Sequence, residues 1–245
     1  MTIRVFDVET TDLEHREIIE AAYCTIDYTT DVMPMVDFTS AYLFTANELH
    51  YEQFAPTHPI SLGAMSTHHI VESDLLFCEP SSSFKLPTDT AYLIGHNIDF
   101  DWKAAGEPDV KRICTLALSR WLFPDIDSHT LTSMMYYAFG EGIRDRVRGS
   151  HNAGVDVVNT AKLLIEFLIP KANAWLQEHK KREIADIERL WEVSEAARIP
   201  TVMAFGKHKG VSIKKLPVDY CEWILRQPDI DPYLVAAIKR KLGRA

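Results

Sequence analysis

The chain has 245 residues, of which 47% are hydrophobic and 25% charged, a composition typical of a globular protein with one large domain, or one domain and a small module. No apolar run reaches membrane-spanning length and the acidic N-terminus does not look like a signal peptide, so we expect no membrane partner. Four scattered cysteines without a C-x-x-C pair indicate reduced thiols in a cytoplasmic protein.

Charge is distributed unevenly, although the net charge is −9. Residues 1–110 hold four Lys and Arg against nineteen Asp and Glu, whereas residues 111–245 hold twenty-two against sixteen. An acidic half beside a basic half fits an acidic metal site served by a phosphate-binding surface. The same pattern also fits a protein whose charges are merely segregated.

The first part of the chain is predicted to be mostly strands. Three strands in close succession predict an antiparallel meander, and they cover residues 3–7, 17–28 and 35–44. A short helix is expected within residues 59–70, and a buried strand at 90–96.

Strand and helix then alternate. Residues 112–123 are predicted as a strand passing into a helix, residues 128–140 as a helix that ends at its glycine, and residues 144–154 as a polar loop. From residue 155, apolar residues recur at helical spacing until Pro170. These elements together predict an α/β fold with a mixed sheet.

The end of the chain shows a different pattern. Residues 172–198 are charged and are predicted to form a helical connector. Residues 199–245 have their own apolar and aromatic residues, which predict a small α+β module.

Acidic residues end the first predicted strand, in "IRVFDVETTD". Residues two apart on a strand point to the same face, so Asp7 and Glu9 should project together. Two neighbouring carboxylates repel one another unless a cation lies between them. Taken alone, such a pair is more often a solvated strand end beside a turn.

Two later motifs add acids at comparable places. The stretch "GHNIDFD" puts Asp99 and Asp101 after a strand, where open α/β sheets bind ligands. The stretch "HNAGVD" puts Asp156 in the first turns of a helix and His151 in the loop before it. Singly, the former acids could be helix caps, and Asp156 could simply complement the helix dipole.

In this order and spacing, the three motifs resemble those of the DEDDh family of 3′→5′ exonucleases, which includes polymerase proofreading subunits, RNase T and oligoribonuclease. The resemblance implies an RNase H-like mixed sheet flanked by helices, the exonuclease fold, over residues 1–171. The "FGKHKG" stretch within 199–245 resembles a C-terminal module found in part of this group. Residues 172–198 would then connect the exonuclease domain to the module.

The resemblance also implies chemistry. The family uses two divalent cations, Mg²⁺ or Mn²⁺, which here would be held by Asp7, Glu9, Asp101 and Asp156, with Asp7 bridging both ions. His151 would be the general base that activates water. Zinc would fit less well, since it prefers His and Cys ligands. The product would be a nucleoside 5′-monophosphate.

The choice between Asp99 and Asp101 follows from the family spacing, which places the ligand four residues after Asn97. At the position of Asp12 the family often has glycine in a left-handed turn, and Asp is among the few residues that tolerate this conformation.

Substrate contacts are implied in the same way. Thr10 would contact the 3′-hydroxyl through its backbone, and Leu13 would form a wedge beside the terminal base. His68 would lie near the substrate, unless it is only a polar residue at a helix end. The implied substrate-binding residues are Thr10, Leu13, His68, Asn97, Lys207 and Lys209. The two lysines flank a glycine-rich turn and are candidate phosphate contacts, as are the basic residues of 144–148 and 214–215.

The expected function is therefore 3′→5′ hydrolysis of DNA, at single-stranded and duplex 3′ ends, with a role in DNA repair. One alternative is an RNA 3′-end exoribonuclease of the same fold, because the catalytic motifs do not read the 2′-hydroxyl. Two further alternatives are a nucleic-acid-binding protein with a vestigial site and a structural metal-binding protein. The five intact catalytic residues argue against a vestigial site, and His151 beside the acids argues against a purely structural metal site. The sequence does not identify a protein partner.

Overall fold

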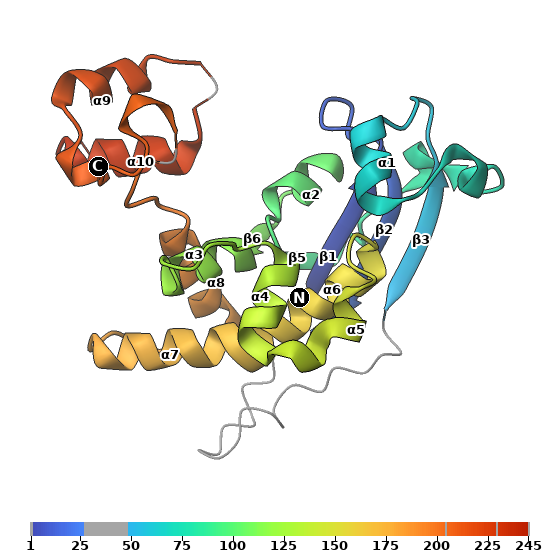
Figure 1. The fold of residues 1–245 in the computed structure, drawn as a ribbon, viewed down its shortest axis with the longest axis horizontal. Coiled ribbons are helices and arrows are strands. Elements are labelled where there is room, and N and C mark those ends of the chain that lie inside the picture. The colour runs from blue at the N-terminus through green and yellow to red at the C-terminus, as the bar shows by residue number, and fades with distance from the viewer. Residues whose placement is uncertain (1, 27–48, 204, 229, 245) are drawn as a thin grey trace. The chain divides into compact units, whose positions relative to one another are not determined.

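A computed structural model describes residues 2–26, 49–203, 205–228 and 230–244 of the chain, which divides into two compact units, Met1–Ser194 and Glu195–Ala245 (Figure 1). The first unit is built on a mixed sheet of six strands in the order β4-β3-β2-β1-β5-β6 among its described residues. The strands are β1 Thr2–Thr10, β2 Ile18–Thr25, β3 His50–Ala55, β4 Glu79–Pro80, β5 Thr90–Gly95 and β6 Lys111–Cys114. This confirms the predicted α/β fold with a mixed sheet.

The sheet changes direction at β1. Strands β1, β2 and β3 pair antiparallel, whereas β5 lies parallel to β1 and β6 lies parallel to β5. Residues 3–6 of β1 are all buried, as expected for a central strand that is covered on both faces. The parallel pairing of β1 and β5 brings the carboxyl ends of both strands to the same edge of the sheet.

The predicted meander is confirmed for β1 and β2, but its third described strand is β3, which the sequence did not predict. Strand β3 is polar, and its first three residues are exposed, so it carries little of the apolar alternation by which strands are recognised. Backbone pairing with β2 holds it in the sheet. The strand expected at residues 35–44 lies outside the described residues.

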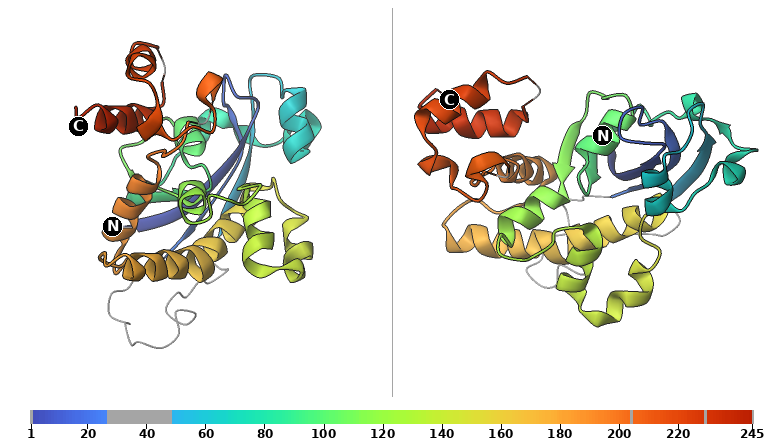
Figure 2. Two further views of the ribbon diagram at one scale, coloured as in Figure 1. Left: turned by 60° about the vertical axis from the view of Figure 1, so that its left-hand side comes forward. Right: turned by 45° about the horizontal axis from the view of Figure 1, so that its top comes forward.

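Helices cover the sheet and extend the unit (Figure 2). In chain order they are α1 Leu62–His68, α2 Asp99–Ala104, α3 Thr115–Leu122, α4 Leu131–Phe139, α5 Arg144–Val147, α6 Ala153–Leu163, α7 Ile169–Glu178 and α8 Ile187–Ala197, the last of which contains the boundary between the units. Short 3₁₀ turns lie at Glu72–Leu75, Ser81–Ser83 and Glu141–Ile143. Helix α6 packs against β1 and β2. Within the described part of the chain, no helix is both long enough and apolar enough to cross a bilayer.

Two predictions about the helices were wrong. Residues 144–154 are not wholly a loop, because α5 forms within them, anchored by the buried side chains of Ile143 and Val147. Pro170 does not end the helix before it: α6 passes through a π-helical segment, Leu164–Leu168, directly into α7. The wider π turn accommodates the proline, whose ring excludes the ordinary bond to the fourth carbonyl before it.

The expected connector contributes to the interior of the first unit. Ala172 and Leu176 of α7 are buried, as are Leu190 and Val193 of α8. The hydroxyl of Ser194 accepts a hydrogen bond of 2.8 Å from the backbone N–H of Cys114. The residue limits proposed for domain, connector and module stay a prediction.

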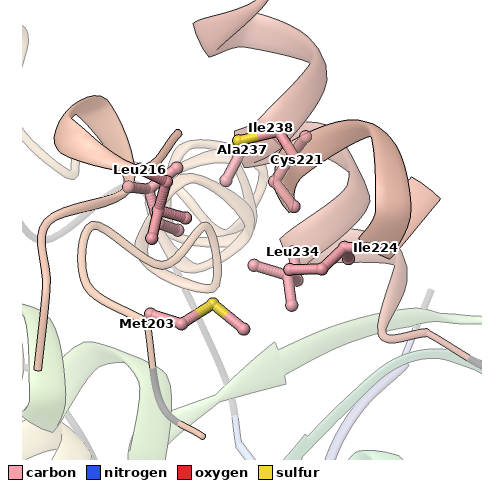
Figure 3. Close-up of a cluster of buried hydrophobic side chains, with 8 residues drawn as sticks. Met203, Leu216, Cys221, Ile224, Leu234, Ala237 and Ile238 are labelled. Carbon is pink, nitrogen blue, oxygen red and sulfur yellow. The ribbon is translucent and has the colours of Figure 1, made fainter. Parts of the chain in front are cut away.

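The second unit has its own apolar core. Helices α9 Val218–Leu225 and α10 Pro232–Lys241 pack together with two 3₁₀ turns, Gly206–His208 and Ile213–Lys215 (Figure 3). The buried cluster consists of Met203, Ile213, Leu216, Cys221, Ile224, Leu234, Ala237 and Ile238. Among its described residues the β structure is limited to one antiparallel bridge, Val202 to Ser212, so the unit is more helical than the predicted α+β module.

Candidate active site

The two acids of β1 lie where the strand begins to alternate between buried and half-buried residues. Asp7 and Glu9 are half-buried, while Phe6, Val8 and Thr10 between and beside them are buried. The two carboxylates therefore share one face of the central strand, as the sequence predicted. The opposite face belongs to the core.

Asp101 reaches the same place from α2. This helix follows β5, whose last residue, Gly95, lies so close to β1 that an added Cβ would be 3.1 Å from the carbonyl oxygen of Phe6. Asn97 continues the turn with a φ of 77°. The buried carboxylate of Asp101 accepts a hydrogen bond of 3.1 Å from the backbone N–H of Val8. Asp101 thus lies against β1 between the positions of Asp7 and Glu9.

The neighbouring acid has a different environment. Asp99 forms an ion pair with Arg112 of β6. The structure therefore distinguishes the two candidates: Asp101 is brought to the acids of β1, whereas the charge of Asp99 is balanced elsewhere.

The third motif arrives on the N-terminus of α6. The side chain of Asn152 caps this helix by accepting from the backbone N–H of Val155 at 3.1 Å. His151 precedes the cap in a left-handed conformation, with a φ of 67°, and its backbone N–H donates to Asp156 at 3.0 Å. Ligand atoms of Glu9, His151 and Asp156 lie within 4.8 Å of one another. His151 is exposed, so its imidazole is open to solvent and to a substrate.

Burial and repulsion from neighbouring carboxylates raise the pKa values of all four acids. Burial raises the pKa of Asp7 well above its usual range, and repulsion from Asp101, Asp156 and Glu9 adds to this. The pKa of Glu9 rises to about 8 through burial and then through repulsion from Asp156. Burial also raises the pKa of Asp101 to about 8, against the opposing bond from Val8, and raises that of Asp156. The site therefore concentrates negative charge that its own side chains do not compensate.

These residues fit divalent cations that prefer oxygen ligands. Among the described residues, no Lys or Arg forms an ion pair with any of the four carboxylates, and Oδ1 of Asp156 is buried without a hydrogen-bond partner. Carboxylate oxygens with one imidazole are ligands suited to Mg²⁺ or Mn²⁺. A cation would lower the repulsion that raises the pKa values and would give Asp156 Oδ1 a partner.

The sequence analysis missed Glu20, which lies on β2 directly opposite Glu9 in the strand register and is only 1% exposed. Its carboxylate accepts four hydrogen bonds, from Tyr51 Oη at 2.5 Å, Gln53 Nε2 at 3.0 Å, Asn152 Nδ2 at 3.0 Å and the backbone N–H of Ala153 at 2.6 Å. Two of these donors belong to the N-terminus of α6, so Glu20 joins this helix to β2. The available signal was a charged residue inside the apolar strand "EIIEAAY".

Glu20 also affects its surroundings electrostatically. Burial, followed by the hydrogen bond to Glu20, raises the pKa of Tyr51 to about 12. Because a carboxylate can accept at both oxygens and donates nothing, it matches four donors. We therefore infer that Glu20 positions the N-terminus of α6, and with it Asp156 and the preceding His151.

The predicted substrate residues of the first unit have contrasting environments. Thr10 is buried at the end of β1, and Leu13 in the following loop is 77% exposed. His68 is buried at the end of α1, where its Nδ1 accepts from the backbone N–H of Ile70 at 3.0 Å, and burial lowers its pKa. Asn97 is exposed and shapes the turn before α2. Lys207 and Lys209 are exposed in the second unit.

The prediction of a left-handed Asp12 was wrong. In the described loop after β1, the left-handed residue is Arg16, with a φ of 51°. The carboxylate of Asp12 instead accepts from the backbone N–H groups of His15 and Glu14, each at 2.6 Å. The bond from His15 contributes most to lowering the pKa of Asp12 to about 2. These bonds shape the loop without a positive φ at Asp12.

Comparison with known proteins gives a distant relationship. No model of a protein family matches the chain. Exodeoxyribonuclease 10 of Escherichia coli (strain K12) is 26% identical over 197 residues, which cover 76% of this chain and 81% of that protein.

Solved structures share the fold. A zinc-bound complex of E. coli ExoI with single-stranded DNA superimposes with a TM-score of 0.51 at 16% identity, covering 73% of this chain and 42% of that one. A second exonuclease I structure gives a TM-score of 0.50 at 15% identity, covering 84% and 49%. An exonuclease X complex with 5′-overhanging duplex DNA aligns with a TM-score of 0.49 at 21% identity, covering 77% and 99%. The chain is a distant homologue of exodeoxyribonuclease 10 and has the exonuclease fold of these solved structures.

Proposed function

We propose that this protein is a metal-dependent 3′→5′ exonuclease that hydrolyses DNA, at single-stranded and duplex 3′ ends, to nucleoside 5′-monophosphates. The observation that carries the proposal is the convergence of Asp7, Glu9, Asp101 and Asp156 from three separate elements, with His151 exposed beside them. Distant homology to an exodeoxyribonuclease supports DNA as the substrate.

The residues present would hold two ions of Mg²⁺ or Mn²⁺ through the four carboxylates. When bound, such ions activate water and stabilise negative charge on the attacking and leaving oxygens. The backbone bond from Val8 fixes one oxygen of Asp101, and the bond from His151 fixes one oxygen of Asp156. These bonds orient the carboxylates before any substrate binds.

His151 serves as the general base. Its imidazole lies on the exposed side of the acid cluster, and its left-handed backbone is set by the bond from its N–H to Asp156. A positioned imidazole can accept the proton of the attacking water near neutral pH.

The 3′-terminal nucleotide would bind at the end of β1. The backbone of Thr10 would hold the 3′-hydroxyl, and the exposed Leu13 would contact the terminal base. His68 and Asn97 border this region in our proposal. Lys207 and Lys209 would contact phosphates and would make binding dependent on salt. A role in DNA repair and a cytoplasmic location stay predictions.

A direct test uses oligonucleotides labelled at the 5′ end, as single-stranded DNA, blunt duplex DNA and RNA, with Mg²⁺, Mn²⁺ or EDTA. The expected result is a descending ladder of DNA products that requires the metal. Cleavage of circular single-stranded DNA, or full activity in EDTA, would refute the proposal. A ladder on RNA alone would replace it with the exoribonuclease alternative.

Two acids that are two residues apart on α2 provide a matched pair of variants. Asp101→Asn should abolish turnover, while Asp99→Asn should stay within about threefold of the wild type because the carboxylate of Asp99 pairs with Arg112 of β6. His151→Ala should lower kcat by about 10²- to 10⁴-fold. Equal losses in the two aspartate variants would mean that α2 acts through its structure rather than through Asp101.

A further inference from the structure

Helix α9 carries two neighbouring aromatic rings. Tyr220 is half-buried at the border of the apolar cluster of the second unit, whereas Trp223 is partly exposed. Cys221 and Ile224 point into the apolar cluster of the second unit (Figure 3). Tyr220 and Trp223 are three residues apart and so share another face of the helix. Their rings stack with centroids 5.6 Å apart and planes inclined by 23°, and 47% of Trp223 is exposed.

The glycine-rich turn brings basic residues to these rings. The ring of His208 meets Tyr220 edge to face at a centroid distance of 4.4 Å, and Nζ of Lys207 lies 5.8 Å from the centroid of Tyr220. Gly206 permits this approach, because it has a φ of 68° and a Cβ there would be 3.1 Å from Oη of Tyr220. The turn therefore places the ammonium group of Lys207 over the ring of Tyr220.

The charge around the face is favourable to an anion. Residues 195–245 hold ten Lys and Arg against five Asp and Glu. Lys207, Lys209 and Asp219 are exposed, while Glu222 of the same helix is already paired with Arg244. Positive charge beside a flat ring is the combination by which proteins bind single-stranded nucleic acids, through phosphates and bases together.

We infer that the exposed ring of Trp223, supported by the stacked ring of Tyr220, forms a platform on which an unpaired nucleotide stacks, with Lys207 at its phosphate. The inference rests on the proposed function for its substrate class, and adds that the second unit contacts bases as well as phosphates. Stacking is tolerant of sequence, because every base has an aromatic face. The platform therefore suits an enzyme that must hold single strands of any sequence.

The test measures binding in EDTA, where no hydrolysis occurs, so that its result does not depend on catalysis. Fluorescence anisotropy of the full-length protein would use a labelled oligothymidylate and an abasic oligomer with the same number of phosphates. Trp223→Ala should weaken binding of the oligothymidylate by about 5- to 150-fold, and Trp223→Phe should restore most of it. Both variants should bind the abasic oligomer as the wild type does.

Two controls separate stacking from charge and from folding. Val218→Ala removes another exposed apolar side chain of α9 and should not change either affinity. Lys207→Ala should weaken binding of both oligomers, and its effect should shrink as salt rises. Unchanged binding of the oligothymidylate by Trp223→Ala would overturn the inference. An equal loss on both oligomers would also overturn it, since stacking requires a base.

A second measurement needs no variant. An oligonucleotide containing 5-iodouracil, irradiated with the wild-type protein in EDTA, should cross-link to the peptide that contains Tyr220 and Trp223. Cross-links confined to residues of the first unit would refute the platform and leave the proposed exonuclease function intact.

Discussion

Removing one charge from the acid cluster should stabilise the metal-free protein, and Glu9→Gln is the clearest case. Burial and repulsion raise the pKa of Glu9 from its ordinary value of 4.5 to about 8. Between these two values the folded state binds more protons than the unfolded state, so the free energy of unfolding falls as pH rises. At 1.36 kcal/mol for each pKa unit, the full effect of ionising Glu9 is about 5 kcal/mol above pH 8. It vanishes below about pH 4.5, where the carboxyl is protonated in both states.

The assay is urea unfolding in EDTA at several pH values between 4.5 and 9. The wild type should lose stability across this range, whereas Glu9→Gln should lose less and should be the more stable protein by about 2 to 5 kcal/mol at pH 8.5. Glu14→Gln removes the same charge from an exposed position nearby and controls for net charge. Adding Mg²⁺ at pH 8.5 should stabilise the wild type more than Glu9→Gln, because the ion binds only the folded site.

The reasoning would fail in either of two ways. If the free energy of unfolding of the wild type in EDTA stays constant or rises from pH 5 to 8, ionisation of the clustered carboxylates does not destabilise the folded state. If Glu9→Gln and Glu14→Gln change stability equally, the effect comes from net charge and not from the cluster.

Three further predictions concern other parts of the molecule. Glu20→Gln should lower kcat more than tenfold with little change in KM, and should lower the free energy of unfolding measured with urea by about 1 to 3 kcal/mol, because an amide cannot accept from all four donors. A kcat equal to that of the wild type would show that α6 is positioned without Glu20. Asp156→Asn should abolish turnover while its melting temperature in EDTA holds or rises; marked destabilisation would make Asp156 structural. The double variant Lys207→Ala, Lys209→Ala should raise KM at low salt with kcat nearly unchanged, a difference that shrinks as salt rises; normal degradation of naked DNA at every salt concentration would remove these lysines from DNA binding.

Local sequence patterns were sufficient to predict the features that depend on periodicity. Alternation along a strand places Asp7 and Glu9 on one face wherever that strand lies. The stretch "HNAGVD" likewise places Asp156 in the first turns of a helix, and α6 does begin at Ala153. The order of strands and helices then limits the chain to an α/β fold with a mixed sheet.

Features that depend on partners distant in sequence arise only in the folded chain. The role of Glu20 is invisible locally, because its four donors come from β3 and from the start of α6. Only the packing of α2 shows that Asp101 bonds to Val8 of β1 while Asp99 pairs with Arg112 of β6.

Backbone geometry was likewise decided by packing. Pro170 stays within a continuous helix because a π turn precedes it, although proline ordinarily ends one. Strand β3 has almost no apolar alternation and exists because β2 offers it backbone partners. In each case the interaction that determines the structure joins segments that are close only in the folded chain. A local sequence pattern therefore cannot predict it.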